Sequence, residues 1–417
     1  MKRQRIGIVG AGISGLACAH FLHRHHDITV FEKDGRIGGH SHTVMVPEGD
    51  REVPVDTGFM VYNEVTYPLL TRLFAQLGVA TKPTSMSFSV QHTRNKLEFN
   101  GGSLNLLFGQ RRNLLRPRFW KMLAQINRFN RETVQEIKEP HHPHLTLQEY
   151  VAARGYGNDF LNWYLSPMAA AVWSCPPDKI RDFPAHTLMR FWYNHGFLGL
   201  DTQHPWRTVD GGSRRYVEKL TAPFASDIIR NAEVKEVTDD LKVVLGDGGE
   251  HAFDQVIIAA HGDEALRMLA SPTAAERDLL GAFSFQPNNA VLHTDHDFMP
   301  RTKRCWASWN YRVEGDKHST HYWMNSLQGV SDRANYFVSI NPTAVRETRV
   351  VRKLSYEHPV FNLASLNAQE RIMDLHEVGK STGRYYCGAW QRYGFHEDGI
   401  WSADRLCGFL LGKDPWS

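Results

Sequence analysis

A glycine-rich turn close to the N-terminus constrains this chain more than any other feature. Residues 6–9 (IGIV) are apolar and mostly β-branched, which predicts a buried parallel strand, and the apolar residues after Gly15 recur with a helical period. Gly10, Gly12 and Gly15 therefore fall in a strand-to-helix turn. In such a turn the first glycine permits the bend, the second lets a pyrophosphate approach the backbone, and the third lets the helix lie close to the strand. The helix N-terminus, at Ile13 and Ser14, then offers free N–H groups to the phosphates.

The following strand and loop distinguish between dinucleotides. The stretch DITVFEKD reads as a second strand that ends at Glu32, twenty residues after Gly12, followed by Lys33. A carboxylate there accepts hydrogen bonds from both ribose hydroxyls and disfavours the 2′-phosphate of NADP. Arg36 and the pair Gly38-Gly39 come next, and they suit the close passage of a cofactor longer than NAD. We therefore expect FAD, with a further close approach at Gly58 and Phe59 in the stretch VDTGFMVYN.

These motifs resemble the FAD-binding flavin amine oxidase and phytoene desaturase superfamily. Glu32, Arg36, Gly38 and Gly39 match its pattern, with His40 where a further arginine is usual. The stretch NAEVKEV (231–237) resembles the strand whose backbone, here at Val234, touches adenine, and FDQVIIAA (253–260) resembles the closing strand of the nucleotide domain. The resemblance implies a final flavin-binding segment with these residues: Gly388, Trp390 (where glutamate is usual), Gly399 and Ile400. We expect the FAD to be bound noncovalently, because nothing in the spacing around Cys305 suggests a covalent attachment.

The sequence between these motifs resembles a narrower group of proteins. FPAHTLMRFWYNHGFL (183–198), WRTVDGGSRRYVEKL (206–220), CWASWNYR (305–312) and HYWMNSLQ (321–328) are similar to predicted FAD-dependent oxidoreductases found beside bacterial cyclopropane fatty-acid synthases, and to the oxidase-like half of the plant synthases. This resemblance implies a lipid or fatty-acyl substrate and a functional link to a cyclopropane fatty-acid synthase-like methyltransferase.

The order of the motifs predicts an α/β fold with two interleaved domains. Residues 1–75, 213–282 and 383–417 are expected to form a discontinuous Rossmann-like FAD-binding domain. Residues 76–212 and 283–382 are expected to form an α+β substrate domain. The alternating stretches AVLHTDHDF, RCWASWNYRV, HYWMNSL and NYFVSIN predict a mostly antiparallel sheet there, with helices before residue 170.

Composition indicates a cellular location for the protein and gives no support to some classes of binding partner. A net charge of +3 over 417 residues gives no reason to expect nucleic acid. Five dispersed cysteines fit a reducing compartment without disulfides or zinc, and the three histidines of KEPHHPHLT (138–146) read as a solvated loop, so no metal is expected. The N-terminus is taken up by the nucleotide strand, which leaves no room for a signal peptide, and no apolar run reaches the length of a membrane span. A cytoplasmic protein is expected.

Segment 109–123 (GQRRNLLRPRFWKML) mixes five basic residues with leucine, phenylalanine and tryptophan. A helix face packed on the substrate domain explains it, and so does peripheral contact with anionic lipid at the inner membrane face.

The expected chemistry is dehydrogenation of an apolar substrate by hydride transfer to flavin N5. Aromatic residues of a sheet strand, Trp309 and Tyr311, are candidates for the pocket over the flavin, although sheet core explains them too. His195 is a candidate proton carrier or a structural histidine. Two alternatives stay open: a flavin amine oxidase, for which no lysine near N5 can be identified, and a noncatalytic FAD-bound partner of a lipid-modifying methyltransferase.

Overall fold

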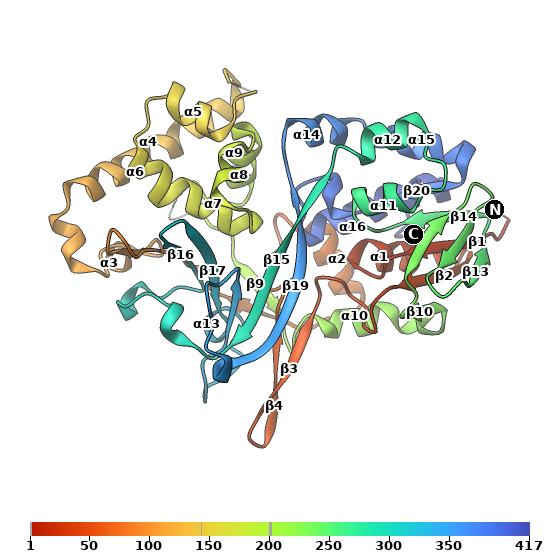
Figure 1. Ribbon diagram of the computed structural model, residues 1–417, viewed down its shortest axis with the longest axis horizontal. Helices are drawn as coiled ribbons and strands as arrows, with labels where there is room; N and C mark the ends of the chain where they lie inside the picture. The colour runs from red at the N-terminus through yellow and green to blue at the C-terminus, as the bar shows by residue number, and fades with distance from the viewer. Residues whose placement is uncertain (1, 143, 200–201) are drawn as a thin grey trace.

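A five-stranded parallel sheet forms the centre of one lobe in the computed structural model, which describes residues 2–142, 144–199 and 202–417 (Figure 1). All of its neighbouring strands run parallel. In spatial order the strands are β10 (Ile228–Arg230), β2 (Asp27–Glu32), β1 (Arg5–Val9), β14 (Gln255–Ile258) and β20 (Arg384–Tyr386). These strands come from all three segments predicted for the FAD-binding domain, because the chain leaves the lobe twice and returns; the domain limits themselves stay predictions.

Helices cover both faces of this sheet, as the apolar strands require. The first helix, α1 (Ile13–Leu22), packs beside the last, α16 (His396–Leu411). The others on this lobe are α2 (Pro68–Gln76), α10 (Arg214–Thr221), α11 (Gly262–Met268), α12 (Ala274–Leu280), α14 (Leu363–Glu370) and α15 (Ile372–Thr382).

A seven-stranded sheet forms the centre of the second lobe. Its spatial order is β19 (Val350–Val360), β15 (Ser284–His293), β18 (Phe337–Ile340), β17 (Lys317–Trp323), β16 (Trp309–Glu314), β7 (Phe88–His92) and β8 (Leu97–Asn100). Only the β16–β7 pair is parallel within it. The expectation of a mostly antiparallel sheet is confirmed, and the long strands β15 and β19 run from this lobe towards the parallel sheet (Figure 1).

A helical layer packs on the seven-stranded sheet. It contains α3 (Leu104–Leu107), a 3₁₀ turn at Arg111–Leu115, α4 (Pro117–Lys138), α5 (Leu147–Ala153), α6 (Asn158–Phe160), a π-helical turn at Leu161–Leu165, α7 (Ser166–Trp173), α8 (Pro177–Arg181) and α9 (Ala185–Asn194). Phe129, Phe160 and Trp192 are completely buried at its centre. Within the described residues, no helix combines the length and the apolar character needed to cross a bilayer.

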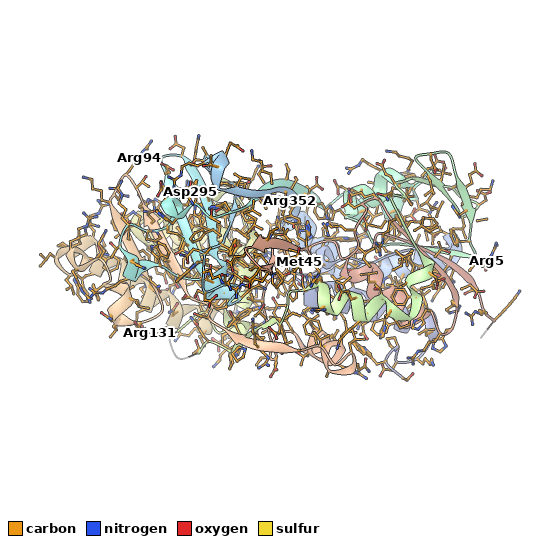
Figure 2. All side chains as sticks on the ribbon, turned by 90° about the horizontal axis from the view of Figure 1, so that it is seen from below. Arg5, Met45, Arg94, Arg131, Asp295 and Arg352 are labelled. Atoms are coloured by element: carbon orange, nitrogen blue, oxygen red, sulfur yellow. The ribbon has the colours of Figure 1, made fainter. Side chains whose placement is uncertain are left out.

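Smaller sheets complete the fold. The hairpin β3 (Thr43–Glu48) and β4 (Arg51–Asp56) projects from the molecule (Figure 1). The two three-stranded sheets are β11 (Val234–Val237), β12 (Lys242–Leu245) and β13 (Glu250–Ala252), and β5 (Tyr62–Asn63), β9 (Trp206–Val209) and β6 (Thr81–Thr84). A short helix, α13 (Met324–Leu327), follows β17. Figure 2 shows the extent of the molecule, with Arg5 at one end and Arg94 and Arg131 at the other.

Candidate cofactor and substrate site

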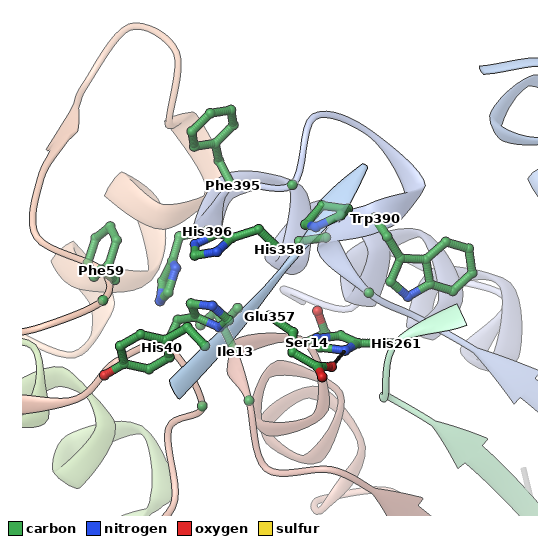
Figure 3. A pocket seen from close by; sticks show the side chains of 18 of the residues that line it. Ile13, Ser14, His40, Phe59, His261, Glu357, His358, Trp390, Phe395 and His396 are labelled. Carbon is green, nitrogen blue, oxygen red and sulfur yellow. Dashed lines mark ion pairs between the residues drawn. The ribbon is translucent and has the colours of Figure 1, made fainter. Parts of the chain in front are cut away.

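One long cavity of about 690 Å³ lies between the lobes (Figure 3). Its walls come from the β1–α1 turn, the end of β2, β11, the β14–α11 turn, β19 and the segment before α16. The carboxyl ends of β1, β2 and β14 therefore meet at the cavity, which is the edge at which open parallel sheets bind ligands. Of the residues predicted to bind cofactor, these line it: Gly10, Gly12, Ile13, Ser14, Glu32, Lys33, Arg36, Gly39, His40, Gly58, Phe59, Val234, Gly388 and Trp390.

The glycines of the β1–α1 turn differ in what surrounds them. A Cβ added at Gly12 would meet no atom within 4 Å, so this backbone faces open cavity. A Cβ at Gly15 would lie 2.0 Å from the carbonyl oxygen of Gly10, because α1 lies directly against the turn. No side chain of the described residues caps the N-terminus of α1, which leaves its first N–H groups available to an anion.

Charges beside this turn suit a phosphorylated nucleoside. Both oxygens of Glu32 point back to the backbone and accept hydrogen bonds from the amides of Ala11 (2.9 Å) and Asp34 (3.0 Å). This holds the carboxylate at the ribose position next to the turn. Arg36 donates to the carbonyl oxygen of Gly39 (2.7 Å) and pairs with no carboxylate among the described residues. Its remaining positive charge therefore faces the same part of the cavity as the N-terminus of α1.

The nucleotide end of the cavity is closed by a network of charged side chains. Lys33 pairs with Glu264 (3.2 Å), and His261 Nδ1 lies 3.2 Å from Glu357 and 3.6 Å from Glu264. The imidazole of His261 stacks on Phe285 at 4.0 Å. The ligand atoms of His261, Glu264 and Glu357 lie within 4.8 Å of one another, a spacing that a metal ion can bridge. The sequence did not predict this group, and we assign no ion to it.

Beyond the β1–α1 turn, aromatic and imidazole rings line the cavity (Figure 3). His40 stacks on Tyr356 at 5.0 Å, and Phe59 stacks on His396 at 3.8 Å. A Cβ at Gly58 would lie 2.3 Å from the carbonyl oxygen of His40, so only glycine allows this close approach of two backbone segments. Burial lowers the pKa of His40 well below its usual value and that of His396 to about 3, so both rings are neutral.

The C-terminal segment forms one wall and the base of this region. The indole N–H of Trp390 donates to the carbonyl oxygen of Ala260 (3.0 Å), and its ring packs on Phe283 at 4.5 Å, so one edge of this buried side chain lines the cavity. Gly399 and Ile400, predicted to contact the cofactor, do not line the cavity. Gly399 lets α16 lie close to α1, since a Cβ there would be 2.6 Å from Ile13, and contact of these two residues with the cofactor stays a prediction.

Gly15 and Gly38 also lie outside the cavity lining. The amide of Gly38 donates to the carbonyl oxygen of Ala11 (2.8 Å), which ties the Arg36 loop to the glycine turn. Both glycines therefore shape the cradle without lining the cavity, and Gly15 serves the close approach of helix and strand that its spacing predicts.

An aromatic chamber occupies the end of the cavity that faces the second lobe. Its members are Tyr67, Trp173, Phe191, His195, Phe197, Trp206, Trp309, Tyr322 and Phe395. Adjacent rings pack closely, as between Phe191 and Phe395 at 5.0 Å and between Trp309 and Tyr322 at 5.3 Å. The indole N–H groups of Trp206 and Trp309 are buried and have no hydrogen-bond partner among the described residues.

The predicted catalytic residues lie in different places. Trp309 lines the chamber, whereas Tyr311 does not reach it: its side chain is buried among the helical layer, and its hydroxyl lies 3.1 Å from His318 Nδ1. This corrects the expectation that both residues of that face line the flavin pocket. His195 lines the chamber, where its Nδ1–H donates to the carbonyl oxygen of Phe191 (2.9 Å). Burial lowers the pKa of His195 to about 4, so the ring is neutral and a weak base.

Sequence reasoning missed the contribution of β19. This strand brings Tyr356 and His358 to the cavity, and burial lowers the pKa of His358 to about 4. Alternation of apolar and polar residues in VVRKLSYEHPV could have predicted this strand. The alternation is obscured because β19 is an edge strand and carries charged residues on its exposed face. Phe395 and His396, just before and at the start of α16, were also missed as wall residues.

The cavity fits FAD along its whole length. Val234 and Ala232 would seat the adenine, Glu32 would bind the ribose, and the α1 N-terminus with Arg36 would hold the diphosphate. The open space at Gly12 is the approach that a diphosphate needs. The neutral region beyond suits a planar ring system. All five cysteines are buried, and among the described residues none of them forms a disulfide or lines the cavity.

A dinucleotide cradle that continues into an aromatic chamber is the arrangement of an FAD-dependent oxidoreductase. The model of the family described as flavin containing amine oxidoreductase matches residues 13–359. The chain therefore belongs to the flavin containing amine oxidoreductase family, and the predicted superfamily, fold and cofactor are confirmed.

Solved structures share the fold over nearly the whole chain. A putrescine oxidase variant superposes with a TM-score of 0.67 at 14% identity and covers 98% of this chain and 99% of its own. A fatty acid isomerase from P. acnes that produces CLA superposes with a TM-score of 0.66 at 14% identity, covering 97% and 98%. Protoporphyrinogen oxidase 2 of Arabidopsis thaliana is 54% identical over 43 residues, which are 10% of this chain and only 8% of that protein.

Proposed function

We propose that this protein dehydrogenates an apolar substrate with an acyl group, such as a fatty-acyl lipid. The observation that carries the proposal is the chemistry of the aromatic chamber. No residue of the chamber is a carboxylate, lysine or arginine, and its one histidine, His195, is neutral. The acidic residues that line the cavity, among those described, are Glu32, Asp34, Glu233, Glu264 and Glu357, and they belong to the nucleotide-binding elements and to the network around His261. An ionic group on a substrate would be desolvated in the chamber without a partner.

The absence of a carboxylate from the described residues of the chamber distinguishes a lipid from an amine. A protonated amine is a cation, and burying it without a charged partner is costly. The hydrocarbon part of a fatty-acyl lipid instead buries apolar surface against the aromatic walls. The chamber therefore favours a fatty-acyl compound over an amine.

The remaining chamber residues position the substrate and exclude water. FAD, when bound, supplies the acceptor for the hydride that the substrate loses. The aromatic walls keep water from the reacting carbon atoms. Because His195 Nδ1 donates to Phe191, its Nε2 carries a lone pair and can accept a hydrogen bond or a proton from the substrate. Its low pKa predicts that its protonation does not change the rate near neutral pH.

Resemblances support the lipid assignment without fixing the bond that is oxidised. The segments FPAHTLMRFWYNHGFL, CWASWNYR and HYWMNSLQ resemble proteins associated with cyclopropane fatty-acid synthases, and a fatty acid isomerase shares the fold. We include in the proposal a functional link to a methyltransferase of that kind, which would share the acyl-lipid substrate. Putrescine oxidase shares the fold equally well, so the fold does not choose between lipid and amine.

Anaerobic reduction of the bound flavin tests the proposal. We expect fatty-acyl methyl esters or phospholipids to bleach the flavin absorbance, and putrescine and cyclohexylamine to leave it unchanged. Trp206→Ala, which removes one aromatic wall of the chamber, should raise KM for the acyl substrate by roughly tenfold, the equivalent of about 1.4 kcal/mol of lost apolar contact. Trp416→Ala is the matched control, because the Trp416 indole donates to Asp404 outside the cavity. Reduction by amines alone supports an amine oxidase, and reduction by neither class supports a noncatalytic partner; both results contradict the proposal.

A further inference from the structure

Exposed apolar side chains gather at one end of the substrate lobe. Leu104 on α3 is 68% exposed, Leu115 on the following 3₁₀ turn is 87% exposed, and Trp120 at the start of α4 is 49% exposed. Leu114 is 47% exposed, and its carbonyl oxygen accepts a hydrogen bond from Trp120 Nε1 (2.9 Å). The Trp120 ring packs on Phe108 at 5.0 Å, which joins the three elements into one surface. α3 and the start of α4 lie at the end of the lobe away from the parallel sheet (Figure 1).

Cations lie on the same segments as these side chains and on the adjoining segment 300–305. The basic group consists of Lys96, Arg111, Arg112, Arg116, Lys121, Arg301, Lys303 and Arg304. Among the described residues none of the eight pairs with a carboxylate; Arg111, for example, donates only to oxygens of Asn105 and Phe108. Desolvation and the neighbouring Arg112 lower the pKa of Arg116. We call the four apolar residues together with this basic group the basic apolar patch.

The parts of the patch are held in one surface by short contacts. Arg112 donates to the carbonyl oxygen of Lys96, and Arg116 donates to the same oxygen (3.4 Å). The 300–305 segment closes over α3, since a Cβ at Gly109 would lie 2.9 Å from Cys305 and 3.3 Å from Arg304. In residues 95–123 and 300–305 the only acid is Glu98, which is 4% exposed and accepts hydrogen bonds from the amides of Arg301 and Thr302.

We propose that the basic apolar patch docks this protein on the surface of an anionic lipid bilayer. Exposed leucines and a tryptophan, on segments that also carry cations unpaired within the described residues, match both the acyl boundary and the charged headgroups of such a surface. A nucleic acid would pair with the cations but gives no partner to a leucine that is 87% exposed. The interaction does not depend on the reaction in the chamber, so it stands or falls separately from the proposed function.

Vesicle flotation with the FAD-loaded protein tests this proposal. We expect the protein to float with vesicles of phosphatidylcholine and phosphatidylglycerol, and not with phosphatidylcholine alone. High salt should release it, because the attraction of exposed charges is screened. Arg111→Glu combined with Arg112→Glu should weaken binding by more than tenfold, since each cation near an anionic surface contributes roughly fivefold. Leu115→Ser should also weaken binding, at unchanged salt dependence.

A matched control comes from the opposite edge of the same sheet. Val351 is 37% exposed beside the exposed Arg352 on β19, which pairs with no carboxylate in the described part of the chain, so Val351→Ser with Arg352→Glu makes a similar change outside the patch. This control should float as the unchanged protein does, and every variant should keep its FAD and its unfolding temperature. Equal flotation with both vesicle types, wild-type binding by the double arginine variant, or displacement from vesicles by a short DNA duplex would each overturn the proposal.

Discussion

Alanine at two glycines of the same turn should separate cofactor binding from folding. At Gly12 the backbone has φ −78°, which alanine adopts freely, and the added methyl would meet no protein atom within 4 Å. The apo-protein should therefore keep its stability or gain about 0.4–1 kcal/mol, because alanine reduces the entropy of the unfolded chain. The methyl group would nevertheless stand where the diphosphate approaches. Loss of one charge-assisted backbone hydrogen bond, about 1.5–3 kcal/mol, weakens FAD binding roughly 10- to 150-fold.

At Gly15 the same substitution should fail for a different reason. Its Cβ would lie 2.0 Å from the Gly10 carbonyl oxygen, which is backbone and cannot move aside. This is roughly 1.5 Å short of a normal contact, and overpacking of this kind costs about 1–3 kcal/mol or more. Thermal unfolding of both apo-variants and FAD titration by flavin fluorescence measure the two effects. Wild-type FAD affinity in Gly12→Ala, or an undisturbed unfolding temperature in Gly15→Ala, would refute this reasoning.

Two further predictions concern buried charges. Burial raises the pKa of Asp398 from 3.8 to about 7, so the folded state holds a proton that the unfolded state releases, and stability should fall as the pH rises from about 4 to 7. Asp398→Asn keeps an acceptor for the amide of Phe395 and should remove this dependence of stability on pH. Urea unfolding at pH 8 should show a free energy of unfolding up to about 4 kcal/mol higher than that of the unchanged protein. An unchanged pH profile would contradict the raised pKa of Asp398. Glu276 and Arg384 form a buried ion pair at 2.9 Å, and Asp239, which is more exposed, also pairs with the guanidinium at 3.0 Å. Glu276→Gln should cost about 3–5 kcal/mol, because the buried guanidinium loses its buried carboxylate and keeps only the exposed one; a loss below about 1 kcal/mol in urea unfolding would contradict this expectation.

The sequence was most informative where a local motif alone determines the geometry. The spacing of Gly10, Gly12 and Gly15 predicts the β1–α1 turn because each glycine meets a different steric requirement within one short segment. Glu32 was placed from its distance along the chain, since a parallel strand of known length ends there. The strand stretches of the second lobe were recognised by alternation, and the sheet was confirmed.

The sequence was less informative where distant segments meet. Alternation placed Trp309 and Tyr311 on one face of β16, but only the packing of the helical layer shows that the cavity ends between them. Gly399 matched a motif, yet it serves the contact between α16 and α1, which no local pattern reveals. The edge strand β19 carries charges on its exposed side, and its delivery of Tyr356 to the cavity depends on pairing with β15 over ten residues.

We expect the cavity between the lobes to hold one noncovalent FAD per chain. Acid precipitation of protein purified from a riboflavin-replete host measures this directly. All of the yellow flavin should appear in the supernatant, it should be FAD, and its amount should equal that of the protein. A folded, colourless protein that takes up no FAD when titrated with it would contradict this expectation.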